Sequence, residues 1–387
     1  MSDVAWYALV ALAAAVTTAV MTVPARQIAR KVGYVCVPSD RSVHLRITPY
    51  GGGVAMFSGL CVAIGLGAFI PALHGLYVST NEVIGVVLAC AVILVVGLID
   101  DMRSMSAPAK VAGEVLAACV LYFGGVTMWQ LKIPFSGVLA LGPGILPLIT
   151  ALWVIAITNA INLIDGLDGL AAGIVAIASG TLCIYGLRLE SLQLLNQPNI
   201  GPLVAAATCG LCLGFLPSNF HPARLFMGDA GALLLGVLMS ASTMLIGGRS
   251  TQASGVTYFF FAPLLIPILI LGVPLVDTAF AIVRRTASGQ GFHNADKDHI
   301  HHRLLRLGHG HRRTVVILWL WTALLSGMIL FPLYEPRVNV FIPVGVAAMG
   351  VALYTWFHPG LKRNATNDPP PAPVASSSSG GFPKEMQ

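Results

Sequence analysis

Long apolar segments, separated by short polar stretches, follow one another along almost the whole chain. Most are close to the roughly 20 residues that a helix needs to cross a hydrocarbon core about 30 Å thick. We therefore predict an all-α fold with about eleven transmembrane helices. They cover residues 4–23, 52–70, 83–99, 111–125, 145–160, 170–187, 203–216, 230–246, 258–283, 314–333 and 338–357.

The composition supports a membrane location, because 56% of the 387 residues are hydrophobic and only 10% are charged. A soluble globule cannot bury that much apolar surface. The charges also predict an orientation, since Lys and Arg near span ends stay in the cytoplasm. We expect a multi-pass protein of the plasma membrane, with its N-terminus outside and its C-terminus cytoplasmic. Of 22 Lys and Arg residues, this topology leaves outside only Lys132, Arg188, Arg249 and Arg337.

The chain divides into one membrane domain, residues 1–360, and a tail, residues 361–387, whose Pro, Ser and Gly content predicts disorder. The net charge of +6 comes from residues beside the spans, where they suit anionic lipid and phosphate ligands. We expect no nucleic-acid partner. A homodimer is compatible with the sequence, which does not decide the oligomeric state. The predicted cytoplasmic active-site loops are 24–51, 100–110, 159–169, 217–229 and 284–313.

Aspartate gathers at the predicted cytoplasmic side. Ionisable groups near lipid cost free energy and usually serve a ligand or a wet cavity. Aspartate also holds its oxygen atoms close to the backbone, which suits rigid coordination of a hard cation. Eight of the 16 acidic residues follow this pattern: Asp100, Asp101, Asp165, Asp168, Asp229, Asp277, Asp296 and Asp298.

Asp100 and Asp101 lie at the end of the third predicted span. Neighbours on a helix point about 100° apart, so the two carboxylates should not bind one metal in the same way. One could hold a metal or its water while the other handles a proton, or each could meet a different phosphate. A solvated helix end is the plainer alternative.

A polar residue recurs at every third position near the end of the fifth span. Each step of three drifts about 60° around a helix, so the first and last members would point in opposite directions. The helix should therefore break, and the glycines at 166 and 169 allow it to do so. The four members are Asn159, Asn162, Asp165 and Asp168.

Asp229 immediately precedes the eighth span. It is either an ordinary N-cap or a carboxylate that binds metal and phosphate together at a helix start. Arg41 and His44, after the first span, can donate to phosphate. Three glycines follow at 51–53, and they would let the backbone approach a ligand or another helix.

The longest predicted cytoplasmic loop, 284–313, is crowded with histidine: six of the ten His lie between His293 and His311. Zinc is one interpretation, but no Cys accompanies these residues and the neighbouring Arg side chains repel cations. Contact with anionic lipid is another. We favour recognition of a nucleotide diphosphate by His and Arg donors. The candidates are His299, His301, His302 and Arg303.

Together these blocks resemble the polyprenyl-phosphate N-acetylhexosamine-1-phosphate transferases, over residues 5–357. That family has ten or eleven transmembrane helices and a cytoplasmic, Mg2+-dependent active site. The stretch 298–307 resembles the branch that transfers N-acetylglucosamine phosphate in lipopolysaccharide, teichoic-acid and arabinogalactan synthesis. The peptidoglycan branch, which uses UDP-MurNAc-pentapeptide, normally carries three consecutive His here. The blocks that carry the resemblance are 41–44, 49–53, 100–101, 159–170, 228–231, Asp277 with Arg284 and Arg285, and 298–303.

The resemblance implies transfer of a phosphosugar from UDP-GlcNAc to a polyprenyl phosphate, with UMP released and Mg2+, or Mn2+, as cofactor. A covalent phosphoenzyme is a rival route. A secondary transporter would instead place polar residues near mid-membrane in repeated halves. The implied catalytic residues are Asp100, Asp101 and Asp168, and the metal ligands Asp229 and Asp165. The implied substrate-binding residues are Arg41, His44, Asn159, Asn162, Asp165, His299, His301, His302 and Arg303.

Overall fold

The computed structural model describes residues 3–36, 47–133, 137–249, 310–334 and 343–350. Several predictions fall outside them: the span 258–283, most of the loop 284–313, and the tail 361–387. The predicted ligands Arg41, His44, His299, His301, His302 and Arg303 lie outside them as well.

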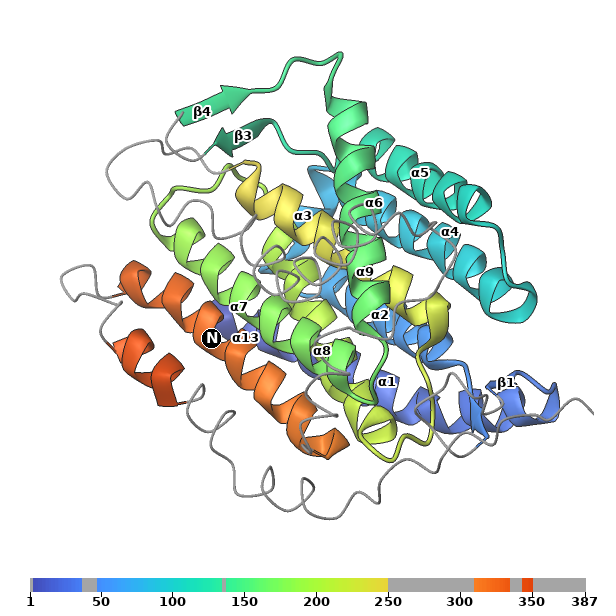
Figure 1. Ribbon diagram of the computed structural model, residues 1–387. Helices are drawn as coiled ribbons and strands as arrows, with labels where there is room; N and C mark the ends of the chain where they lie inside the picture. Colours follow the sequence, from blue (N-terminus) through green and yellow to red (C-terminus); the bar gives the residue numbers. More distant parts are fainter. Residues whose placement is uncertain (1–2, 37–46, 134–136, 250–309, 335–342, 351–387) are drawn as a thin grey trace, which may run out of the picture.

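The described part of the chain is a bundle of long helices (Figure 1). Apart from the short helix α3, which lies between two predicted spans, each contains most of one predicted span and often extends past it, as α1 does beyond residue 23. Residues 343–350, inside the last predicted span, are also helical. The helices are α1 (Asp3–Lys31), α2 (Gly52–Ala68), α3 (His74–Val78), α4 (Glu82–Arg103), α5 (Ala107–Phe123), α6 (Leu146–Ile164), α7 (Leu170–Ser191), α8 (Gly201–Asn219), α9 (Gly228–Gly247) and α13 (His311–Tyr334).

Six of these helices, α1, α4, α6, α7, α8 and α9, are long and apolar enough to cross a membrane within the described ranges. The prediction of a mostly helical membrane protein is confirmed. The count of eleven spans and the orientation of the termini stay predictions.

Two short antiparallel ribbons depart from the all-α prediction. β1 (Val35–Cys36) pairs with β2 (Thr48–Pro49), and β3 (Gln130–Ile133) pairs with β4 (Gly137–Ala140). The hydrophobic pattern missed them because strands of two to four residues are too short to show an alternating period. The first ribbon connects α1 to α2, and the second lies beyond the opposite end of the bundle (Figure 1).

Helix α9 is the core of the bundle, with 94% of its most apolar stretch buried. Small residues let its neighbours come close, as is usual between membrane helices. A Cβ at Gly97 of α4 would collide with the backbone of Ala230, and one at Gly53 of α2 with the backbone of Gly231. Both contacts lie at the N-terminal turn of α9. They bring the ends of α2 and α4 to the start of α9.

Candidate active site

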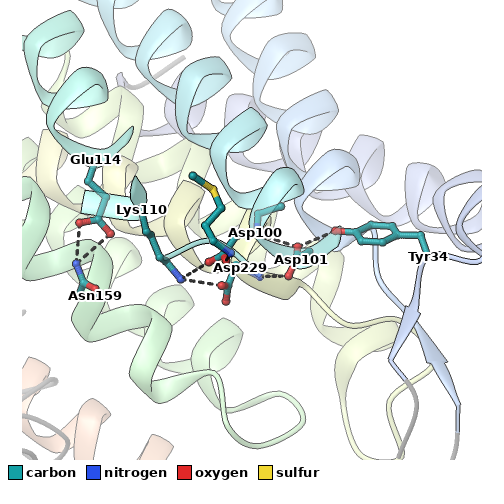
Figure 2. Close-up of polar contacts among 9 residues, drawn as sticks. Tyr34, Asp100, Asp101, Lys110, Glu114, Asn159 and Asp229 are labelled. Atoms are coloured by element: carbon teal, nitrogen blue, oxygen red, sulfur yellow. Dashed lines mark hydrogen bonds and ion pairs between the residues drawn. The ribbon is translucent and has the colours of Figure 1, made fainter. Parts of the chain in front are cut away.

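Asp101, in the last turn of α4, holds the N-terminus of α9. Its carboxylate accepts hydrogen bonds from the backbone N–H groups of Asp229 at 2.8 Å and Ala230 at 3.2 Å, and from the Tyr34 hydroxyl at 2.7 Å (Figure 2). Free N–H groups at a helix start need such an acceptor. The residue at the N-cap of α9, Met227, provides no side-chain bond, and Asp229 lies inside the first turn. The capping carboxylate therefore comes from another helix.

Gly228 makes this contact possible. Its φ of +68° is a left-handed conformation that favours glycine, and a Cβ there would collide with the Asp101 carboxylate. On the other side of Asp101, burial and then the hydrogen bond to Asp101 raise the pKa of Tyr34. The phenol therefore stays protonated and acts as a donor.

The glycines at 51–53 pack against protein rather than forming an open loop. The N–H of Gly52 donates to the carbonyl of Phe226 at 3.0 Å, and the N–H of Phe226 donates to the carbonyl of Pro49 at 2.9 Å. A Cβ at Gly52 would collide with the Phe215 ring. Of the two predicted reasons for these glycines, close approach to another helix is the one the structure shows.

Lys110, in the first turn of α5, lies at the centre of the carboxylate cluster (Figure 2). Its Nζ is 2.9 Å from Asp100 Oδ2 and 2.7 Å from Asp229 Oδ2. The amide of Asn162, oriented to satisfy both neighbours, accepts from Lys110 at 2.7 Å and donates to Asp229 Oδ1 at 2.9 Å. The other oxygen of Asp100 accepts from the Met105 N–H at 2.6 Å. Asp100 and Asp101 thus have different partners, and the division of labour between them stays a prediction.

The polar series from 159 onward breaks the helix as predicted. Helix α6 ends at Ile164, and Gly169, with a φ of +80°, precedes α7. Asn159, one turn before Asn162, does not reach the carboxylate cluster. Its amide instead donates to both oxygens of Glu114, at 3.0 and 2.8 Å (Figure 2).

Asp165 lies in the turn that follows α6. Burial raises its pKa well above the ordinary value, and the negative charges of Asp229, Asp101 and Asp168 raise it further. Its carboxylate has no hydrogen-bonding partner among the described residues. The local field around Asp165 therefore favours a proton or a cation.

Asp168 belongs to a second polar group. Its Oδ2 accepts from the Ala223 N–H at 3.1 Å and is 2.8 Å from His221 Nδ1. The His221 ring stacks on His311, the first residue of α13, with 4.2 Å between the ring centroids. Asp168, His221 and His311 offer potential metal-ligand atoms within 4.8 Å of one another. Arg312 adds a hydrogen bond to the His221 carbonyl at 2.9 Å.

The structure thus assembles Asp100, Asp101, Asn162 and Asp229 into one cluster and places Asp168 in a second. Sequence reasoning missed Tyr34, Lys110, Glu114 and His221 as site residues. Lys110 carried a usable signal, because it is one of two bases, with Arg103, between two aspartates and an apolar helix. Tyr34 carried none, since its role depends on a contact across 67 positions.

Comparison with known proteins finds a matching family model and similar curated proteins. A family model described as glycosyl transferase family 4 matches residues 83–247, which include most of the cluster. A decaprenyl-phosphate N-acetylglucosaminephosphotransferase of Mycobacterium tuberculosis (strain CDC 1551 / Oshkosh) is 39% identical over 89% of this chain and 87% of that protein. The chain belongs to glycosyl transferase family 4.

Other curated relatives in glycosyl transferase family 4 are similar over most of their length. The enzyme of the same name from Mycolicibacterium smegmatis is 38% identical over 92% of this chain and 89% of that protein. A probable undecaprenyl-phosphate N-acetylglucosaminyl 1-phosphate transferase of Bacillus subtilis is 39% identical over 79% of this chain and 78% of that protein. This member of the family is therefore similar both to transferases named for decaprenyl phosphate and to one named for undecaprenyl phosphate.

Proposed function

We propose that this protein transfers N-acetylglucosamine 1-phosphate from UDP-GlcNAc to a polyprenyl phosphate and releases UMP. The observation that carries the proposal is the convergence of Asp100, Asp229 and Asn162 on one cationic group. Membership of glycosyl transferase family 4 and the names of the relatives support the substrates. The distribution of Lys and Arg supports a reaction at the cytoplasmic face of the plasma membrane.

The cluster fits Mg2+, with Mn2+ as the alternative. Its oxygen donors are two carboxylates and an amide, which are hard ligands of the kind Mg2+ prefers. Asp229, Asp100 and Asn162 would hold the ion, with Asp165 facing the same negative field. When bound, the ion would neutralise charge on the diphosphate.

The reaction joins two anions. An oxygen of the lipid phosphate attacks the phosphorus nearest the sugar, the bond from that phosphorus to the oxygen bridging to UMP breaks, and UMP leaves. The main catalytic requirement is neutralisation of negative charge, which Lys110 can meet with its ammonium group. Because the Asp101 carboxylate is already bonded to the start of α9, we assign Asp101 the role of positioning that helix. We assign Asp100 the role of contacting the reactants. Attack by a carboxylate, through a phosphoenzyme, is the rival route.

The decisive experiment uses purified full-length protein with polyprenyl phosphate and a panel of UDP-sugars. UMP release should occur with UDP-GlcNAc and should stop when EDTA removes divalent cations. Turnover with UDP-MurNAc-pentapeptide and none with UDP-GlcNAc would overturn the sugar assignment. Full activity in EDTA would overturn the role of the cation.

A further inference from the structure

The contacts of Lys110 are those expected of a cation held in an oxygen cage. A lysine ammonium has three N–H donors and no acceptor. The three oxygen atoms within reach, from Asp100, Asp229 and Asn162, lie 2.7 to 2.9 Å away. Each donor therefore has one acceptor, and the three acceptors come from three different helices.

The same oxygen atoms are of the kind that binds a divalent cation, and the Asp165 carboxylate shares their negative field. Asp101 is occupied by the α9 N-terminus and Tyr34. Asn159 is occupied by Glu114. A Mg2+ ion needs oxygen ligands about 2.0–2.1 Å away in near-octahedral geometry, which would place it within the volume that the Lys110 ammonium fills.

The cage cannot hold both cations. An ammonium and a divalent ion about 3 Å apart repel strongly in a partly buried site. The Lys110 and Asp100 side chains are only 15% and 10% exposed, so water screens this repulsion weakly. A divalent ion can enter only if the ammonium moves away from Asp100 and Asp229.

We infer that Lys110 is a built-in competitor for the divalent-cation site: it occupies the Asp100–Asp229–Asn162 cage when the ion is absent and leaves when the ion binds. This inference rests on the cation site of the proposed function, and it adds that the Lys110 ammonium regulates the binding of the ion. The competition keeps the carboxylates together in the empty enzyme. On leaving, the ammonium becomes free to meet a phosphate group, to which lysine binds as a point charge.

The first test measures Mn2+ binding to full-length Lys110→Met in detergent. Binding is detected as a loss of the electron paramagnetic resonance signal of free Mn2+. If the cage is open in about a tenth of wild-type molecules, removing the competitor tightens binding about tenfold. Lys31→Met, an exposed lysine at the end of α1, should leave the affinity unchanged. Unchanged or weaker Mn2+ binding by Lys110→Met, or no Mn2+ binding by any form, would overturn the inference.

A second measurement needs no variant and covers the case in which Lys110→Met does not fold. Wild-type protein is acetylated briefly with and without Mg2+, and the modified lysines are quantified by mass spectrometry. Acetylation of Lys110 should increase with Mg2+, while that of Lys31 should not change. Protection of Lys110, or no response to Mg2+, would count against the competition.

The two proposals can fail separately. Neither Mn2+ binding nor acetylation needs a sugar nucleotide or a lipid acceptor. If no UMP were released from UDP-GlcNAc but the Mn2+-binding and acetylation results were as expected, the assigned reaction would be refuted and the competition by Lys110 would stand.

Discussion

The two ends of the α4–α9 pair each carry a charged cluster, and the clusters are built on opposite principles. At the far end from the candidate site, Arg249 donates to Glu82 Oε1, to the carbonyls of Gly125 and Thr127, and stacks 4.5 Å over the Trp129 ring. The Arg249 and Glu82 side chains are 3% and 7% exposed. One positive charge meets one negative charge, and the pair is closed to solvent.

The end that carries the candidate site differs in charge balance and in exposure to solvent. Four aspartates, Asp100, Asp101, Asp165 and Asp229, gather there, and among the described residues the Lys110 ammonium forms ion pairs with two of them, Asp100 and Asp229. The Asp229 side chain is 31% exposed. A protein gains nothing in stability by gathering like charges. A neutral ion pair closed to solvent is typical of a structural contact, whereas an open cluster with excess negative charge is typical of a site for a ligand of opposite charge.

The largest expected effect is at the site end. Asp229→Asn removes one ligand charge and keeps the shape of the side chain. UMP release from UDP-GlcNAc should fall about a thousandfold. The thermal unfolding midpoint should not fall, because a repelling charge has been removed. Activity is measured by UMP release and stability by thermal unfolding in detergent.

Glu190→Gln at the far end of α7 is the matched control for Asp229→Asn, and it should keep the activity of the wild type. If Asp229→Asn lowered stability and activity together, the claim that this end of the helix pair serves a ligand rather than stability would be contradicted.

The next effect is at the opposite end. Arg249→Met leaves Glu82 buried without its partner, which should lower the free energy of unfolding by about 3–5 kcal/mol. Activity per folded molecule should stay the same. The measurement is unfolding in denaturant, with activity normalised to the folded fraction.

Replacing both partners, as in Glu82→Leu with Arg249→Met, should recover most of the lost stability, because no unpaired charge is left. If Arg249→Met lowered the activity of correctly folded molecules, this end would not be purely structural.

The smallest effect tests the support of the site. Tyr34→Phe removes one hydrogen bond to Asp101, worth about 0.5–1.5 kcal/mol, while the two backbone bonds to α9 persist. We expect a several-fold loss in kcat with little change in KM for UDP-GlcNAc. Tyr77→Phe, whose hydroxyl donates to the Ile64 carbonyl, makes the same chemical change away from the site. Equal kcat values in the two variants would show that Asp101 does not need Tyr34.

Local patterns in the sequence predicted the helices and the break at 165–169, because apolar length and residue spacing are local properties. They also predicted that Asp100 and Asp101 would differ. They could not predict how these two differ, because Asp101 is recruited by N–H groups 128 positions later. Lys110 was missed for a related reason: its importance depends on Asp229, 119 positions away. Roles that depend on contacts between distant segments cannot be deduced from spacing alone.

The capping of α9 by Asp101 has a consequence for the order of assembly. The N–H groups that begin α9 find their acceptor only when the end of α4 has docked beside them. Asp229 then reaches its place in the same step. In a newly inserted chain whose helices have not yet closed around α9, Asp100, Asp229 and Asn162 are therefore not yet together. The enzyme can therefore act on its lipid acceptor only after the end of α4 has docked beside the start of α9.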